Sequence, residues 1–315
     1  MNFATVEKIA NAVLYEGYIL YPYRPSSTKN RQRWNFGTLY PRAFAEAQHP
    51  AEAYRMSCEC LIAGSAEAKL DVRVRFLQLA HRNESAEGTA NWEEGVERSA
   101  DRNDLLVADL VRSPATFELR FEPAAAEPVS NHLTGQLEIQ AEAVQDGLFR
   151  LHLELTNLSS VDEAAHAERE RMLAYSFSSA HVLLGARGGQ FVSLLDPPEK
   201  FRAAAAGCQN KGVFPVLVGE QGQHDMLLCS PIILYDYPQI APESAGDFFD
   251  GTEMDEMLAL RVLTLTDEEK QEMRQGDVHA RAILERTETL PAEHLMKVHG
   301  AIRGMRRVPN NEEGS

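Results

Sequence analysis

Acidic side chains gather between positions 236 and 256, where the sequence holds seven carboxylates and no basic residue. Clustered oxygens are the ligands that Ca²⁺ and Mg²⁺ prefer, but these do not follow the alternating EF-hand pattern. The same groups could bind arginines of this chain or of a partner, or open a helix, since acids favour the first turn. For the docking interpretation the candidate residues are Tyr235, Asp236, Asp247, Asp250 and Glu253.

A basic segment near the N-terminus mirrors this acidic run. Between positions 21 and 42 there are five cations and no acid, interleaved with aromatic residues and prolines. Aromatic rings alternating with arginines suit single-stranded nucleic acid, but a net charge of −16 argues against that partner. We therefore expect the segment to contact an acidic protein surface, in this chain or in a partner. The candidate contact residues are Arg24, Arg31, Arg33 and Trp34.

Four cysteines are the remaining candidates for metal chemistry. Structural zinc sites use cysteines separated by two to four residues, whereas Cys58 and Cys60 are separated by one and fall in a predicted strand. Cys208 and Cys229 each stand alone. We expect buried free thiols and no cofactor, and a four-cysteine metal site is the weaker alternative.

Catalytic sequence motifs are missing from the chain. It contains no H-E-x-x-H, G-x-S-x-G or G-x-x-x-x-G-K motif. The glycine-rich GARGG at 185–189 is predicted to be a turn between two strands, because no helix follows it. The sequence favours a non-catalytic protein. The alternatives are a metal-dependent enzyme that uses the acidic run or the cysteines, and a β-sandwich that binds a small molecule.

Size and composition indicate a soluble globular protein. The 315 residues are 44% hydrophobic and 25% charged, which is ordinary for a globular fold. No stretch approaches the ~20 apolar residues that span a membrane, so we expect no membrane insertion. The first residues lack a basic region followed by an apolar core, and cysteines are few, so we expect a cytoplasmic location. The oligomeric state is not indicated.

Alternating apolar and polar residues dominate positions 54–195 and predict an antiparallel sheet with one polar face. The clearest hairpin covers 136–157, with Asp146 and Gly147 at its turn. Positions 85–104 are polar and are predicted to be a surface loop. Positions 161–172 are charged and are predicted to be a loop or an exposed helix.

Helical patterns frame this β region. Positions 5–16 predict a short amphipathic helix capped by Thr5, and the residues after Pro197 and Pro198 predict another. Beyond position 251 the pattern becomes helical, and Thr266 with Glu269 forms a capping box. We predict a mainly β (α+β) fold with an antiparallel β-sandwich-like body over 1–250. A helical C-terminal subdomain over 251–304 and a disordered tail over 305–315 follow.

Several stretches resemble an uncharacterised bacterial family associated with gene clusters of oxygen-tolerant, actinobacterial NiFe hydrogenases. They are VLYEGYILYPYRPSSTKNRQRWNFGTLYPR, AHVLLGARGGQFVSLLDPPE, SPIILYDYPQIAPESAGDFFDGTEMDE and LRVLTLTDEEKQEMR, spread over most of the chain. The resemblance carries no catalytic signature. It implies a cytoplasmic accessory or assembly protein that contacts a hydrogenase subunit or maturation factor.

Overall fold

The computed structural model describes residues 3–16, 23–24, 27, 36–81, 93–123, 132–239, 261–275 and 278–289. The strands are β1 (Arg55–His81), β2 (Glu93–Leu106), β3 (Ala115–Phe121), β4 (Leu133–Gln145), β5 (Leu148–Asn157), β6 (Ser178–Val192), β7 (Phe214–Leu217) and β8 (Met226–Ser230). The α-helices are α1 (Glu7–Tyr15), α3 (Arg42–Ala47), α4 (Val107–Arg112), α5 (Arg169–Leu173), α6 (Arg202–Ala206), α8 (Asp267–Gln275) and α9 (Val278–Glu288). Short 3-10 turns are η1 (Phe3–Thr5), η2 (Ala164–His166) and η3 (Glu199–Phe201).

The eight strands in the described part of the chain belong to one antiparallel sheet, which confirms the mainly β prediction. The order along it is β3-β4-β5-β1-β6-β8-β7, and β2 pairs with β1 outside this path. β1 is the hub, because its 27 residues pair with β5 in the first half and with β2 in the second. The described strands thus form one continuous sheet rather than the two separate sheets that a sandwich requires.

The long strands β1 and β6 bend where glycines lie side by side. The register between them shifts after Gly64, and a Cβ there would lie 2.9 Å from the carbonyl oxygen of Gly188. A Cβ at Gly189 would lie 2.8 Å from Ile62 Cδ1. Only residues without a side chain allow this close approach. GARGG was predicted to be a turn between two strands, and that prediction was wrong: it lies within the continuous strand β6.

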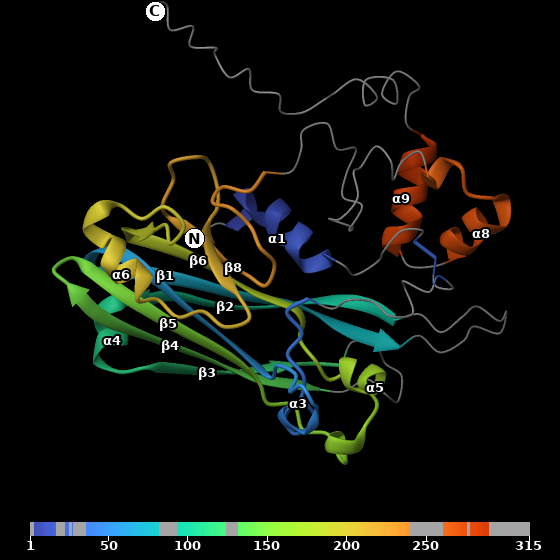
Figure 1. The fold of residues 1–315 in the computed structure, drawn as a ribbon, viewed down its shortest axis with the longest axis horizontal. Helices are drawn as coiled ribbons and strands as arrows, with labels where there is room; N and C mark the ends of the chain where they lie inside the picture. The colour runs from blue at the N-terminus through green and yellow to red at the C-terminus, as the bar shows by residue number, and fades with distance from the viewer. Residues whose placement is uncertain are drawn as a thin grey trace, which may run out of the picture.

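Bending folds the inner face of the sheet onto itself (Figure 1). Phe76 of β1 stacks on Phe177 at 4.3 Å and meets Phe121 of β3 edge-on at 4.8 Å. Inner-face residues of all strands except β2 form the largest apolar cluster, and Val107 and Leu110 of α4 join it. Burial of this apolar area supplies most of the stabilisation of the body.

The predicted hairpin is confirmed, with Leu137 opposite Leu155 and Ile139 opposite Leu153.

The polar stretch 85–104 was predicted to be a loop, but its residues from 93 onward form β2. β2 pairs along most of its length with β1. As an edge strand it can carry polar side chains on both faces, so apolar alternation is absent and the strand was missed.

Helices cover the outer face of the sheet. α1 lies over β6 and β8, where Val6, Ala10 and Val13 pack on Leu183 and Leu228 (Figure 1). The predicted helix is confirmed, but its N-cap is Val6 rather than Thr5. The charged stretch 161–172 contains η2 and most of α5. No helix in the described parts of the chain is long and apolar enough to cross a membrane.

The C-terminal helices α8 and α9 pack together beside the outer face of the sheet (Figure 1). Their Met273, Ile283 and Leu284 share one apolar cluster with Leu14 of α1 and Leu77 of β1. The predicted capping box is present, since Thr266 and Glu269 exchange hydrogen bonds of 2.9 and 3.2 Å. The division into a body over 1–250 and a subdomain over 251–304 stays a prediction, and the tail over 305–315 lies outside the described residues.

Candidate functional site

The segment that leaves β8, residues 230–237, presents the most exposed large apolar side chains among the described residues. We call it the 230–237 loop. Ile233 is 97% exposed and Tyr235 is 83% exposed. Their neighbours Ile232 and Leu234 point the other way and pack on the cluster beneath α1. The backbone thus alternates between an anchored side and a side that presents two large apolar groups to solvent.

Polar contacts fix both ends of this loop. At its start the Ser230 hydroxyl donates to the carbonyl oxygen of Ile232 at 2.9 Å. At its end the carboxylate of Asp236 accepts from Ser193 Oγ at 2.5 Å and from the backbone amide of Leu217 at 2.8 Å. Tyr237 donates its amide to the Leu217 carbonyl oxygen at 2.7 Å and its hydroxyl to Gln223 O at 2.9 Å. These contacts reduce the conformational freedom that the loop would lose on binding.

Two of the predicted contact residues therefore have different roles. Tyr235 projects into solvent, where a partner can reach it. Both carboxylate oxygens of Asp236 hold the loop onto β7 and onto the residue that follows β6. Whether either residue binds a partner stays a prediction. The predicted contact residues Arg31, Arg33, Trp34, Asp247, Asp250 and Glu253 lie outside the described residues.

Arg24 of the basic segment forms ion pairs with α8. Its guanidinium lies 3.1 Å from Glu269 and 3.7 Å from Glu272. These two acids follow the 236–256 run, which was expected to supply the partners if pairing was internal. Adjacent Tyr23 is fully buried in the cluster formed by α8, α9 and α1. This part of the basic segment is thus bound to the C-terminal helices.

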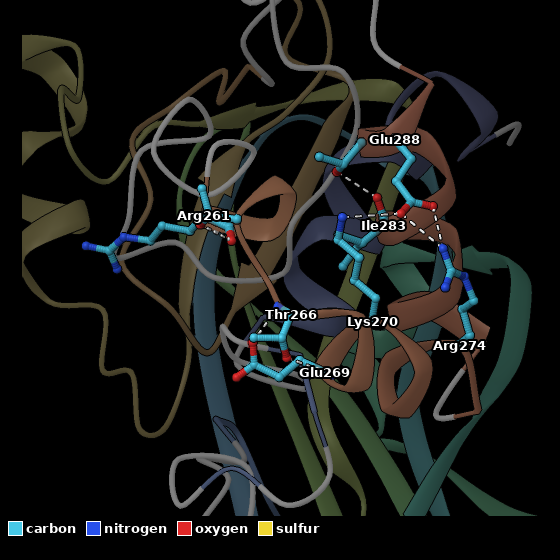
Figure 2. Close-up of polar contacts among 9 residues, drawn as sticks. Arg261, Thr266, Glu269, Lys270, Arg274, Ile283 and Glu288 are labelled. Atoms are coloured by element: carbon cyan, nitrogen blue, oxygen red, sulfur yellow. Dashed lines mark hydrogen bonds and ion pairs between the residues drawn. The ribbon is translucent and has the colours of Figure 1, made fainter.

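The α8–α9 pair carries further charged contacts, drawn in Figure 2. Glu288 of α9 lies 2.9 Å from Arg274 and 3.6 Å from Lys270, both in α8. Figure 2 also shows the capping box of Thr266 and Glu269 at the start of α8. Glu269 therefore serves two contacts, the helix cap and the ion pair with Arg24.

The basic segment lies against the start of the 230–237 loop at Gly37. Gly37 adopts a positive φ of 59°, and a Cβ there would lie 2.6 Å from the Cβ of Pro231. The backbone at Phe36 and Gly37 accepts hydrogen bonds from Ser179 and Ala180 of β6. The fold thus brings together segments that are far apart in the sequence.

The four cysteines are free thiols. Contact with the Cys229 thiol, followed by burial, raises the pKa of Cys58 well above its ordinary value. Burial does the same for Cys60, and it also raises the pKa of the half-buried Cys208. Thiolates are the form that binds metals and reacts. In the portion of the chain that the structure describes, no group of three or more His, Cys, Asp or Glu is arranged to hold a metal ion.

Sequence reasoning missed a partly buried polar cluster on the outer face of the sheet, under α1. Arg75 of β1 donates to Asn11 Oδ1 at 2.7 Å and to Glu97 Oε2 at 3.2 Å. Glu97 in turn accepts from the hydroxyl of Tyr15 at 2.8 Å. Along β1 Arg75 alternates with the apolar residues Val74 and Phe76 of the inner face, and only the position of α1 shows that it is covered.

His181 of β6 lies opposite Arg75 in this cluster and is completely buried. Its Nδ1–H donates to the carbonyl oxygen of Ser179 at 2.8 Å, and its Nε2 has no hydrogen-bond partner. Burial, assisted by the positive charge of Arg75, lowers the pKa of His181 to about 4. At neutral pH the imidazole is therefore uncharged.

A buried carboxylate, that of Asp71, holds the irregular pairing of β1 and β2. Asp71 is fully buried and accepts from the amide of Asp104 at 2.8 Å and from Arg187 at 2.8 Å. The register between β1 and β2 shifts next to Asp71, and Asp104 has a positive φ of 61°. These contacts fix backbone geometry where the pairing is irregular.

Comparison with protein-family models gave no match for this chain, and comparison with curated proteins gave none either.

Proposed function

We propose that this protein is a non-catalytic accessory or assembly protein that acts through protein–protein contacts, with the 230–237 loop as a contact surface. The observation that carries the proposal is the exposure of Ile233 and Tyr235 between fixed ends. Neighbouring exposed apolar groups mark interaction sites more often than single scattered ones do. Tyrosine is also among the residues that dominate binding energy at interfaces.

The partner in this proposal is a hydrogenase subunit or maturation factor, as the sequence resemblance implies. Its complementary surface would be an apolar recess that takes Ile233 and Tyr235. A basic rim around that recess would suit a chain with a net charge of −16, because opposite charge accelerates association. A cytoplasmic location belongs to the proposal, and the free thiols of the four cysteines support it.

The test replaces the two exposed side chains together, as Ile233→Ser and Tyr235→Ser, in the full chain. The fixed ends remain, so the free energy of unfolding should change by no more than about 0.5 kcal/mol per site. Pull-down and titration with purified NiFe hydrogenase subunits should show affinity reduced by at least about tenfold.

A matched control replaces two other exposed apolar residues, Leu158→Ser and Val111→Ser, which are 47% and 39% exposed. This variant should bind as the original chain does. Equal binding by the loop variant and the control would contradict the loop as contact surface. If the original chain binds no hydrogenase subunit or maturation factor, the hydrogenase assignment fails.

A further inference from the structure

A groove of about 450 Å³ separates two strands that lie at edges of the folded sheet. We call it the β2–β3 groove; its lining residues are Ser99, Ala100, Arg102, Glu118, Leu119, Arg120 and Phe121. Among the described strands, β2 pairs with β1 alone and β3 pairs with β4 alone. Each strand therefore turns one row of backbone groups toward the groove.

Arginine side chains span this groove in place of backbone pairing. Arg102 of β2 donates to the carbonyl oxygen of Glu118 at 3.2 Å, and Arg98 donates to that of Glu122 at 2.7 Å. Alternate residues of a strand turn their backbone groups to the same side. The amide and carbonyl of Arg120, between these two, therefore face the groove as well. Because long side chains make the bridge, β2 and β3 lie farther apart than the ~4.8 Å between paired strands.

The floor of the groove is apolar and its walls are mostly cationic. Leu119 and Phe121 are buried core residues that reach the groove, and Arg102 lies over the ring of Phe117 at 5.0 Å. Arg120 is 80% exposed, and its ion pair with Glu118 at 3.1 Å is equally exposed and therefore weak. Glu122, another carboxylate near the groove, lies 3.4 Å from His132.

We infer that the β2–β3 groove binds an extended acidic peptide of a partner protein, which adds as a strand between β2 and β3. The unpaired edges supply main-chain hydrogen bonds, as in other cases of strand addition. Alternate side chains of the peptide would meet the apolar floor, so they should be apolar. The side chains between them would meet Arg102 and Arg120, so they should be acidic.

Binding exchanges one set of hydrogen bonds for another. Peptide amides replace the arginine donors at the carbonyl oxygens of Glu118 and Glu122. The released guanidinium groups of Arg98 and Arg102 then donate to peptide carboxylates, and such charge-assisted bonds are stronger than those to neutral carbonyls. This site is separate from the 230–237 loop and does not depend on the function proposed for that loop.

The test titrates the full chain with a peptide whose valine–glutamate repeat spans the 7 residues of β3. A matched peptide carries lysine in place of glutamate. The glutamate peptide should bind at least about tenfold more tightly, and its affinity should fall as salt is added. Hydrogen exchange should show the Arg120 amide protected only when the glutamate peptide is bound. Equal binding of both peptides, or no protection of Arg120, would overturn the inference.

Two variants separate the charged and backbone contributions. Arg102→Gln should weaken binding of the glutamate peptide by about tenfold, whereas Arg202→Gln, which changes an exposed arginine of α6, should not. Arg120→Pro removes the groove-facing amide without touching the β4 pairing, and proline is tolerated at sheet edges, so this variant should fold but lose the peptide. If Arg120→Pro binds the glutamate peptide as tightly as the original chain does, strand addition is overturned. If the protein instead dimerises through the groove, a second copy of this chain rather than a partner peptide fills it, and the inference is also overturned. The Ile233→Ser, Tyr235→Ser variant should bind the peptide normally, so the two proposals can fail independently.

Discussion

The two faces of the folded sheet are stabilised in different ways. The inner face encloses an almost wholly apolar cluster in which Phe76, Phe121 and Phe177 meet. The outer face, under α1 and beside α8–α9, holds buried Arg75 and His181 and the ion pairs of Arg24. Apolar burial is insensitive to pH and to moderate salt, whereas charged contacts respond to both. We therefore expect the body to depend on packing, and the attachment of its helices to depend also on solution conditions.

The largest expected effect comes from the inner face, by Phe76→Ala. Phe76 is fully buried between the two folded halves of the sheet, so its removal leaves a cavity that neither half can fill. The free energy of unfolding should fall by about 3–5 kcal/mol. Urea denaturation followed by far-UV circular dichroism measures this loss. A loss of less than about 1 kcal/mol would contradict the importance of inner-face packing.

A smaller effect, dependent on pH, is expected from His181 on the outer face. Its pKa is about 4 in the folded protein and about 6.5 in an unfolded chain. Well above pH 6.5 the imidazole is neutral in both the folded and the unfolded state and contributes no pH dependence. As the pH falls from 6.5 to 4, the unfolded state takes up a proton that the folded state excludes, so folding is destabilised by up to about 3 kcal/mol.

The variant His181→Gln removes this titration and keeps a side chain that can donate to Ser179 O. Its free energy of unfolding should therefore decline less steeply than that of the original chain between pH 6.5 and pH 4. His132→Gln changes a histidine that is 68% exposed and serves as the control. If His181→Gln leaves the pH slope unaltered, the outer face does not have the pH sensitivity described above.

Patterns among residues close in the sequence predicted the elements whose structure depends on those residues alone. The β4–β5 hairpin followed from strict alternation and from Asp146-Gly147, and the capping box from the spacing of Thr266 and Glu269. β2 was missed because an edge strand needs no apolar stripe. The bend at Gly64 and Gly189 was missed because it depends on two strands meeting, which neither glycine reveals alone.

The candidate site was predictable only in part, because it too depends on contacts between segments that are distant in the sequence. The sequence identified Tyr235 but not Ile233, since exposure of an apolar residue depends on what covers it. It also identified Arg24 as a candidate for contact with carboxylates but left open whether these belong to this chain or to a partner, and the structure pairs Arg24 with Glu269 and Glu272 of α8. Charge runs show which residues can pair, whereas the fold decides which acids lie within reach.

The smallest expected effect is the loss of the ion pairs between Arg24 and α8. Both side chains of the closer pair are about one quarter exposed, so Arg24→Gln should lower the free energy of unfolding by only about 0.5–1 kcal/mol at low salt. At about 1 M salt, where the Debye length is about 3 Å, the difference should largely vanish. Hydrogen exchange should show faster opening of α8 while β1 and β6 stay protected. Arg112→Gln, at an exposed pair within α4, serves as the control and should leave α8 unaffected. If Arg24→Gln instead lowers the free energy of unfolding equally at both salt concentrations, the contact acts through packing of the arginine stem beside Tyr23. The outer face would then be stabilised by packing at this point, as the inner face is.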